Sequence, residues 1–387
     1  MACERKQLPR DLRFVYSKDA KLGFSLVNKS GPVKLKVRSI PVNTGSGANV
    51  HKLEIVTRNK KTYHAVSKIH FSSNERKLRG LQHEREVYEF LNHLVDEKIC
   101  PFFLRSYVVK PNSPDNVRYM DNILLTESFP SGRYTTMNRF LKSRPSKLKT
   151  PTDAINFLLM LLYTIEIMYR VGLRHNDMHL NNIFIIQCPK TTFEIKYVRR
   201  DNDKFNFFLH NVKYIPLFFD NDRATKLSPL PGVRFRHAHH FTPKSHTAVT
   251  ARFHWHNPQH RTEKLDMYKL MQHIRNTVIN TSPVYRVVRN TCYNGSKRRH
   301  CLSEGGALQN RIAKNVQSSA FRNYHLPLDK KNANGTEIIP HWSGTSERFL
   351  FELIKQLPRQ KKEASVVTLD MGKLYTKSNV LNSPDMK

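Results

Sequence analysis

The chain has 387 residues, of which 39% are hydrophobic, which is enough for the core of one large domain or two ordinary domains. Its 14 Gly and the lack of long runs of one residue type exclude a low-complexity protein. The 65 Lys and Arg against 31 Asp and Glu give a formal net charge of +34. A charge of this size predicts nonspecific affinity for polyanions, nucleic acid included.

The cysteines and the apolar stretches indicate in which cellular compartment the protein is expected to occur. The five Cys residues form no C-x-x-C pair, and their odd number favours reduced thiols over a disulfide framework. The amino-terminal segment lacks the apolar core of a signal peptide. The most apolar stretch, residues 155–168, is short for a membrane span and contains Asn156 and Glu166. We therefore expect a soluble intracellular protein with no membrane span.

A β-rich unit is expected over residues 31–128. It follows polar residues 1–30, which are either an N-terminal extension or irregular strands. Strand-like patterns predict five strands, at residues 33–37, 51–57, 62–69, 102–110 and 122–127. Between the third and fourth strands, Ser72 and Glu75 form a capping-box signal, and apolar residues then recur at helical spacing as far as Val95. The pattern indicates a five-stranded sheet interrupted by one helix.

A second, mainly helical unit is expected over residues 129–360. Helical patterns cover residues 135–142, 151–171, 263–279 and 346–357. Shorter β patterns cover residues 182–187, 193–198, 206–209 and 212–219. The long apolar helix is expected to start at Thr150 or Pro151, to end at Gly172 and to lie buried in the core. Residues 361–387 are expected to be a mobile tail.

The loop after the long helix carries the most specific motif. It runs from His175 through Asp177 to Asn182 in the pattern H-x-D-x-x-x-x-N. A carboxylate can accept the proton of an attacking hydroxyl, and an amide oxygen is a ligand that Mg²⁺ accepts. A loop that combines Asp177 and Asn182 therefore suits phosphoryl transfer.

Other candidate parts of such a site lie upstream and downstream. Gly45 and Gly47 occupy a turn between two predicted strands, where they would let backbone N–H groups approach phosphates, although a plain hairpin turn explains them equally well. Lys68, in the predicted strand A-V-S-K-I, is a candidate cation or else an ordinary surface lysine. Asp220 ends an apolar strand pattern and is a candidate metal ligand or else a turn residue.

Lys68, Asp177, Asn182 and Asp220 occur in an order that is typical of one family. Over about residues 40–280, the chain resembles a divergent member of the protein-kinase-like superfamily and is similar to serine/threonine protein kinases of large DNA viruses. The resemblance implies an α+β, two-lobed fold with a small β-rich N-lobe and a larger, mainly helical C-lobe. It also implies ATP as the phosphate donor and Mg²⁺ as the cofactor.

The resemblance implies roles for the catalytic residues. Asp177 would orient the substrate hydroxyl, and Lys68 would contact the ATP phosphates. In kinases this lysine is held by a glutamate on the next helix; we favour Glu84, with Glu86 as the competing partner. His179 stands where many protein kinases have a lysine that contacts the transferred phosphate, and its charge depends on pH near neutrality.

The metal-binding residues implied by the resemblance are Asn182 and Asp220. The segment that begins at Asp220 corresponds to the D-F-G motif, but Asp222 replaces its glycine. The interval between Asn182 and Asp220 exceeds the usual short hairpin. An inserted β-hairpin near residues 189–211 accounts for the extra length.

The ATP-binding residues implied by the resemblance come from two places. Gly45 and Gly47 would approach the phosphates, but Val50 stands near the position of the third glycine of the family loop. The backbone groups of Glu127 and Phe129 would bind the adenine base. Only the position of this stretch in the chain supports that last expectation.

His175 and Asp266 are expected to support the loop, and other histidines offer zinc binding as an alternative. His175 would brace the catalytic loop, and Asp266 resembles the aspartate of a central helix that supports that loop. The histidines in residues 237–240 and 254–256 are a weak alternative signal for zinc, since no Cys or carboxylate lies close to them in the sequence.

The expected activity is phosphoryl transfer to protein serine or threonine. Residues 223–262 would lie where a kinase binds its substrate, and they are basic and contain no Asp or Glu. This composition favours acidic or phosphorylated protein substrates. A viral kinase of this kind would act in the host cytoplasm or nucleus.

Other functions remain open. A small-molecule phosphotransferase of the aminoglycoside or choline type is favoured by His179 and by the missing A-P-E motif. A basic pseudokinase scaffold is favoured by the altered glycine-rich loop and by Asp222. A nucleic-acid-binding protein unrelated to kinases would show steep salt-dependent affinity for DNA or RNA and no requirement for ATP.

Overall fold

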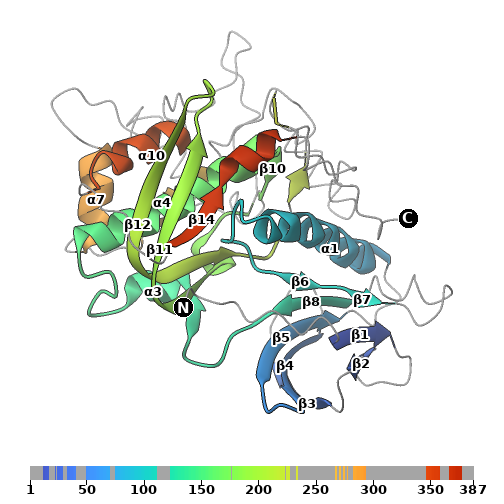
Figure 1. Cartoon of the computed structure of the whole chain (residues 1–387). Helices are drawn as coiled ribbons and strands as arrows, with labels where there is room; N and C mark the ends of the chain where they lie inside the picture. The colour runs from blue at the N-terminus through green and yellow to red at the C-terminus, as the bar shows by residue number, and fades with distance from the viewer. Residues whose placement is uncertain are drawn as a thin grey trace, which may run out of the picture.

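The protein combines sheets and helices, so it has the α+β composition expected from the sequence (Figure 1). The computed structural model describes residues 12–16, 22, 24–28, 33–40, 49–69, 75–110, 123–175, 177–222, 224–226, 232–233, 266–267, 270–271, 273–274, 277, 282–292, 346–357 and 366–376.

A five-stranded antiparallel sheet forms the first part of the chain. In spatial order its strands are β3 (Val33–Ile40), β4 (Asn49–Thr57), β5 (Thr62–Ile69), β8 (Ile123–Glu127) and β6 (Ser106–Tyr107). The prediction of five strands is confirmed, with one change. The fourth predicted strand, residues 102–110, is divided, and its last residues form β7 (Val109–Lys110) in another sheet.

Helix α1 (Glu75–Asp96) lies along one side of this sheet (Figure 1). Its residues Val87, Leu91 and Leu94 are buried, because their spacing of four and three positions places them on one face of the helix. Glu84 and Tyr88 are buried one turn apart on the same helix. The predicted cap residue Ser72 lies outside the described residues.

The amino-terminal residues contribute to the fold, and two segments of residues 1–30 form strands, in agreement with the second of the two alternatives for this region. β1 (Leu12–Tyr16) pairs antiparallel with β2 (Phe24–Asn28) and parallel with β7. Phe14 and Phe24 are buried and meet edge to face with ring centroids 5.5 Å apart. Burial of these aromatic rings explains why the segments pack as strands.

Helix α4 (Pro151–Arg170) is the core helix of the second part. Thr150 and Asp153 form a capping box at its start, and Gly172 adopts a φ of 77° just after its end. The helix is long and apolar enough to cross a membrane, but 83% of its apolar window is buried inside the protein. It is apolar on all sides because it is surrounded by protein, and a membrane span is not supported.

A long antiparallel hairpin, formed by β11 (Ile183–Val198) and β12 (Lys204–Phe218), stands beside α4 (Figure 1). It merges the four short strands predicted over residues 182–219, and the hairpin expected near residues 189–211 is its outer portion. These strands have 16 and 15 residues. Over the residues that the structure describes, the second part therefore combines a large hairpin with its helices.

The carboxyl-terminal residues 366–376 are ordered, in contrast to the expected mobile tail. β14 (Val366–Asp370) pairs parallel with β11, and the short helix η6 (Met371–Tyr375) follows it. Leu369, Met371 and Leu374 are almost completely buried. Their burial against the hairpin supplies the free energy that orders this segment.

Seven further elements complete the described part: β9 (Tyr134–Thr136), α3 (Met137–Lys142), β10 (Leu173–Arg174), η2 (Leu180–Asn182), β13 (Thr225–Lys226), α7 (Pro283–Cys292) and α10 (Ser346–Ile354). α3 and α10 agree with predicted helices, and the described residues between 266 and 277 are helical as expected. Cys100 is a free, buried thiol, whereas Cys188 is disulfide-bonded, which differs from the expectation of reduced thiols.

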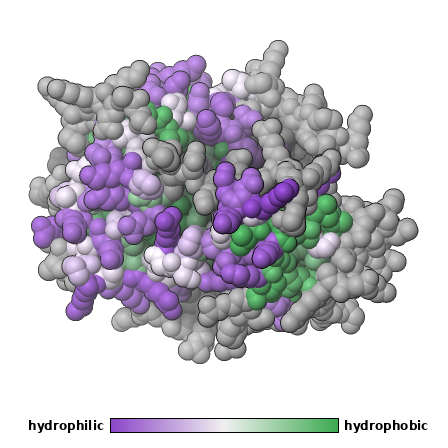
Figure 2. Space-filling view, turned by 60° about the horizontal axis from the view of Figure 1, so that its bottom comes forward, coloured by the Kyte–Doolittle hydropathy of each residue, from purple (hydrophilic) through white to green (hydrophobic). Residues whose placement is uncertain are grey.

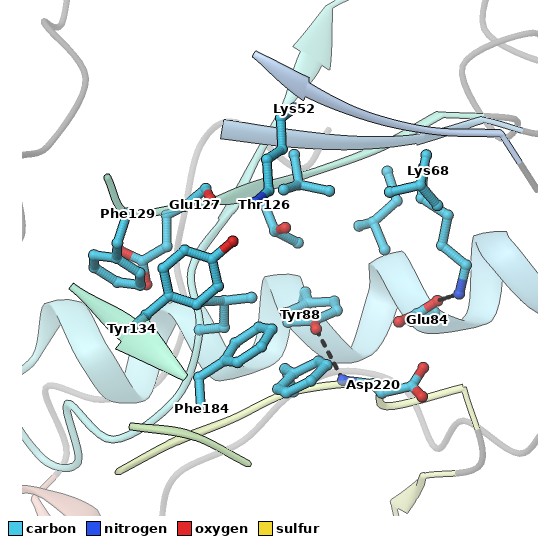
Figure 3. Close-up of a pocket in the computed structure, with 16 residues that line it drawn as sticks. Lys52, Lys68, Glu84, Tyr88, Thr126, Glu127, Phe129, Tyr134, Phe184 and Asp220 are labelled. Carbon is cyan, nitrogen blue, oxygen red and sulfur yellow. Dashed lines mark hydrogen bonds and ion pairs between the residues drawn. The ribbon is translucent and has the colours of Figure 1, made fainter. Parts of the chain in front are cut away.

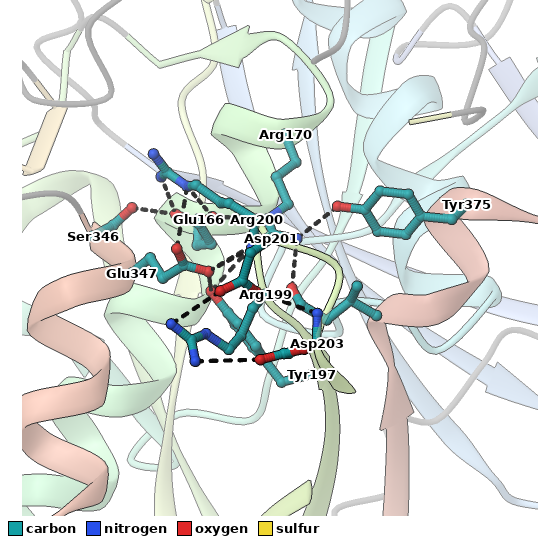
Figure 4. Close-up of polar contacts among 11 residues, drawn as sticks. Glu166, Arg170, Tyr197, Arg199, Arg200, Asp201, Asp203, Ser346, Glu347 and Tyr375 are labelled. Atoms are coloured by element: carbon teal, nitrogen blue, oxygen red, sulfur yellow. Dashed lines mark hydrogen bonds and ion pairs between the residues drawn. The ribbon is translucent and has the colours of Figure 1, made fainter. Parts of the chain in front are cut away.

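A buried polar network joins α4, the tip of the hairpin and α10 (Figure 4). Glu166 and Arg170 are fully buried and form an ion pair of 2.7 Å within α4. Arg200, at the hairpin tip, reaches Glu166 at 2.7 Å, and Glu347 of α10 reaches Arg170 at 3.1 Å. Arg170 also donates to Tyr375, so the network ties the carboxyl-terminal segment to the core.

Candidate functional site

A cavity of about 360 Å³ lies between the five-stranded sheet and the base of the long hairpin (Figure 3). β4, β5 and β8 line one side, α1 closes one end, and the first residues of β11 with those after β12 line the other side. The sequence-predicted site residues that line it are Val50, Lys68, Glu84, Glu127, Phe129 and Asp220.

Lys68 and Glu84 form an ion pair at one end of this cavity (Figure 3). Lys68 Nζ lies 2.8 Å from Glu84 Oε2, and the two side chains are 20% and 4% exposed. The preference for Glu84 over Glu86 agrees with this geometry. Burial by itself lowers the pKa of Lys68, but the charges of Glu84 and Asp220 outweigh it and raise the pKa above its usual value. The ammonium group therefore stays charged.

Among the residues that the structure describes, the charges that act on Lys68 are those of Glu84, Asp220 and Asp222. Burial raises the pKa of Glu84 above its usual value; Lys68 opposes the rise and Asp220 adds to it. Asp222 is also close enough to act on Lys68 electrostatically. Three carboxyl groups thus surround one ammonium group, and a field of this kind attracts a further cation.

Asp220 is held by a hydrogen bond that the sequence did not predict. It adopts a φ of 62°, a left-handed conformation that aspartate tolerates better than most residues. Its backbone N–H donates to the hydroxyl of Tyr88, at 3.1 Å. Burial raises the pKa of Tyr88 well above its usual value, so the hydroxyl stays protonated. The only sequence signal for this role is that Tyr88 lies one turn after Glu84.

The loop of the H-x-D-x-x-x-x-N motif is tied to the segment of Asp220. Asn182 is 4% exposed, and its Nδ2 donates to the backbone oxygen of Asp177 at 3.0 Å and lies 3.5 Å from its Oδ2. The backbone N–H of Phe219 donates to the backbone oxygen of Asn182 at 3.1 Å. These bonds bring the predicted catalytic and metal-binding residues into one region.

Two histidines of the motif support the same loop. The backbone N–H of His175 donates to Asp266 Oδ2 at 2.8 Å, and its Nε2 lies 2.9 Å from the backbone oxygen of Phe219. This is the bracing position expected for His175 and Asp266. His179 Nδ1 accepts from the N–H of Asn181 at 3.2 Å, and its Nε2 lies 3.7 Å from Asp177 Oδ2. The Nδ1 contact requires the tautomer with the proton on Nε2, which faces Asp177.

The other end of the cavity is aromatic. Phe184 and Phe219 stack with ring centroids 3.9 Å apart and an interplanar angle of 7°. Tyr134 meets Phe184 edge to face at 5.4 Å, and Phe129 lies 6.3 Å from Tyr134. Lys52 Nζ lies 5.2 Å from the centre of the Tyr134 ring. The space between the stacked rings of Phe184 and Phe219 and the aliphatic side chains of β4 and β5 suits a flat apolar ring system.

Glu127, whose backbone was expected to bind the adenine base, makes two hydrogen bonds with the backbone of Arg105. The backbone N–H of Glu127 donates to the backbone oxygen of Arg105 at 2.9 Å, and its Oε1 accepts from the N–H of Arg105 at 2.7 Å. The N–H of Glu127 therefore does not face a ligand in the cavity. Glu127 and Phe129 both line the cavity, as their expected roles require, and Thr126 lines it beside them.

Some expected residues lie outside the described part of the chain. These are Gly45 and Gly47, together with the histidines of residues 237–240 and 254–256. Among the residues that the structure does describe, no group of three or more His, Cys, Asp or Glu forms a metal cluster.

Sequence reasoning missed Tyr88, Lys52, Tyr134 and Phe184 as residues of this site. Their contacts depend on which strands and helices meet, and no local pattern marks them. No protein-family model matches the chain, and no curated protein matches it.

Proposed function

We propose that this protein is an ATP- and Mg²⁺-dependent kinase that transfers phosphate to serine or threonine hydroxyls of proteins. In this proposal residues 31–128 act as the N-lobe and residues 129–360 as the C-lobe of a kinase-like fold. The observation that carries it is the Lys68–Glu84 ion pair in a cavity that Asp220 also lines. Asp177, His179 and Asn182 do not line this cavity, but the backbone N–H of its lining residue Phe219 donates to the backbone oxygen of Asn182.

The shape and chemistry of the cavity support a nucleotide. An adenine ring would lie between Val50 and Val66 on one side and Phe184 and Phe219 on the other. The charged Lys68 lies toward the opposite end, where the phosphates of such a ligand would extend. An apolar slot that ends in a cation matches the polarity of ATP along its length.

The residues present fit a magnesium ion. Asp220 offers a carboxylate, and Asn182 donates through Nδ2 to Asp177, which directs its side-chain oxygen elsewhere as a candidate ligand. When bound, Mg²⁺ would neutralise negative charge on the phosphates. Tyr88 holds the backbone at Asp220, so the carboxylate is positioned before the metal arrives.

Asp177 would hold the proton of the attacking hydroxyl at its carboxylate. Asn182 Nδ2 and His179 Nε2 lie 3.5 and 3.7 Å from Asp177 Oδ2 and orient that group. Lys68, kept charged by Glu84, would bind phosphate oxygens. The protein thus contributes orientation and electrostatic stabilisation, which are the main requirements of phosphoryl transfer.

The test is transfer of radiolabelled phosphate from ATP with Mg²⁺ to the protein itself and to acidic and basic model proteins. We expect incorporation that Asp177→Ala and Lys68→Met each reduce by at least about a hundredfold. Lys204→Met, which changes an exposed lysine of β12, is the matched control and should retain activity. Loss of activity in the control alone, or equal activity in all variants, would contradict the site assignment.

A small-molecule phosphotransferase is the second candidate, and the contact of His179 with Asp177 is the observation that favours it. Aminoglycoside and choline acceptors, compared with protein acceptors in the same assay, separate the two activities. Nucleotide binding without any transfer would instead support the pseudokinase scaffold.

A further inference from the structure

We propose that a basic surface between β9 and α4 is the docking site for an acidic segment of the protein substrate. This inference rests on the proposed kinase function and specifies its substrate class. The surface, called the basic strip, consists of Arg133, Arg139, Lys142, Arg144, Lys147 and Lys149.

The basic strip combines six exposed basic side chains with a stretch of sequence that lacks acidic residues. All of its members are exposed, and no acidic residue occurs in the chain between Glu127, which is buried, and Asp153, which caps α4. Within the part of the chain that the structure describes, none of the strip residues forms an ion pair. Figure 2 shows many hydrophilic side chains gathered on one face of the molecule. The positive potential of the basic strip is therefore available to a partner.

The backbone that carries the basic strip is held rigidly. Phe140 and Leu148 are buried and anchor α3 and the loop that follows it. Ser143 donates through its hydroxyl to the backbone oxygen of Phe140 at 2.7 Å, and Ser146 donates to that of Leu148 at 3.0 Å. The charges are thus presented on a preformed surface, which lowers the entropy lost on binding.

The basic strip begins beside the proposed catalytic loop. α3, which carries Arg139 and Lys142, packs against residues 180–182, the turn that follows Asp177 in the motif. Tyr134, next to Arg133, lines the cavity. A polypeptide whose hydroxyl lies at Asp177 can therefore reach the basic strip with residues of the same segment.

Carboxylates are anions that this surface fits. Arginine and lysine side chains bind carboxylates through charge-assisted hydrogen bonds, and arginine does so with two bonds at once. Single-stranded nucleic acid also needs aromatic side chains on which bases stack. The aromatic residues within or beside the strip, Phe129, Tyr134 and Phe140, are packed against the core and are not exposed. An acidic polypeptide is thus favoured over nucleic acid.

The experiment compares two synthetic serine peptides, one with a run of glutamates beside the serine and one with glutamines in their place. The strip variant is Arg139→Glu, Arg144→Glu and Lys147→Glu combined. The control variant changes the net charge equally at exposed positions elsewhere: Arg58→Glu, Lys61→Glu and Lys204→Glu. Fluorescence anisotropy measures peptide binding without ATP, steady-state kinetics measures transfer, and a labelled DNA duplex is the competing ligand.

We expect the wild-type protein and the control variant to bind the glutamate peptide more tightly than the glutamine peptide. The strip variant should lose about tenfold in affinity and in kcat/KM for the glutamate peptide, with KM for ATP unchanged. An equal loss in the control variant, or no preference for glutamate in the wild type, overturns the proposal. So does a strip variant that loses duplex binding only.

The binding measurement separates this proposal from the kinase function. If the strip variant loses peptide affinity and no protein transfers phosphate, the docking surface stands and the kinase proposal fails. If transfer occurs and the strip variant handles both peptides as the wild type does, the kinase proposal stands and the docking surface fails.

Discussion

Glu84 and Glu86 are two positions apart on α1, so they point to different sides of the helix. Only Glu84 lies 2.8 Å from Lys68 in the cavity. Glu84 therefore faces the cavity and Glu86 does not, although they are close in the sequence. Substituting each of them in turn should have different effects on activity.

Replacing Glu84 with glutamine should impair the proposed activity selectively. Glu84→Gln removes the charge that keeps Lys68 paired and positioned, and we expect kcat/KM for ATP to fall by at least about tenfold. Glu86→Gln is the matched control and should remain within about twofold of the wild type. Equal losses in both variants would show that the ion pair has no special role in transfer.

Tyr88 makes the proposed metal site dependent on α1, because its hydroxyl accepts from the N–H of Asp220. We expect Tyr88→Phe to raise the Mg²⁺ concentration needed for half-maximal activity about threefold to tenfold, since Asp220 loses the bond that holds its left-handed backbone.

Tyr163→Phe is the matched control for Tyr88→Phe. Tyr163 is also fully buried, and its hydroxyl donates to the backbone oxygen of Ile99 at 2.7 Å, away from the cavity. Each substitution should lower the free energy of unfolding by about 1–2 kcal/mol, as measured by urea denaturation. An equal change in the Mg²⁺ requirement of both variants would mean that Tyr88 acts only through stability.

At the scale of elements, the network around Glu166 determines how α4, the hairpin and α10 are joined. Glu166 and Arg170 are buried completely within α4, and Arg200 and Glu347 reach them from the hairpin and from α10. Removing one partner from such a network leaves a buried charge without compensation, which is more damaging than the loss of an exposed ion pair.

Glu166→Gln should destabilise the protein in a pH-dependent way. Burial by itself raises the pKa of Glu166, but the hydrogen bond from Arg200 and the charge of Arg170 outweigh it and lower the pKa below its usual value. A lowered folded-state pKa stabilises the protein at pH values above the unfolded pKa, and this stabilisation is lost as the pH falls through the folded pKa.

We therefore expect Glu166→Gln to cost about 3–5 kcal/mol in the free energy of unfolding near pH 7. The difference from the wild type should shrink as the pH falls below about 4. Denaturation at several pH values measures both effects. Glu352→Gln, at a side chain that is 46% exposed, is the control and should change the free energy by less than about 0.5 kcal/mol. A pH-independent cost for Glu166→Gln would contradict the assigned ionisation.

At the scale of the whole molecule, the cavity is built from both parts of the chain, so a ligand that fills it should hold the parts together. ATP should raise the melting temperature, and Mg²⁺ should raise it further, because a ligand that binds only the folded state stabilises it in proportion to RT ln(1 + [L]/Kd). Calorimetry with and without a chelator separates the two contributions.

Asp220→Asn should remove most of the Mg²⁺ contribution while the shift caused by ATP alone remains. Asp201→Asn, at an exposed residue of the hairpin tip, is the matched control and should keep both contributions. If Mg²⁺ stabilises the Asp220→Asn protein as much as the wild type, the metal is held by other residues.

The predictable part of the fold consists of elements with strong local signals. β4 and β5 follow a clear β pattern, and α4 carries a capping residue at Thr150 and a terminating glycine at Gly172. The ordered segment 366–376 was not predicted, because it is short and its sequence neighbours are polar. The parallel pairing of β14 with β11 buries Leu369. Such a pairing joins residues far apart in the chain, and local patterns do not encode it.

The sequence by itself determined the net charge, most of the elements and the order of Lys68, Asp177, Asn182 and Asp220, because charge, periodicity and caps depend only on residues near one another in the chain. The tertiary structure alone decided that Glu84 rather than Glu86 meets Lys68, and that Tyr88 supports Asp220. These outcomes depend on how α1 is rotated and which strands lie beside it, and packing of distant segments sets both.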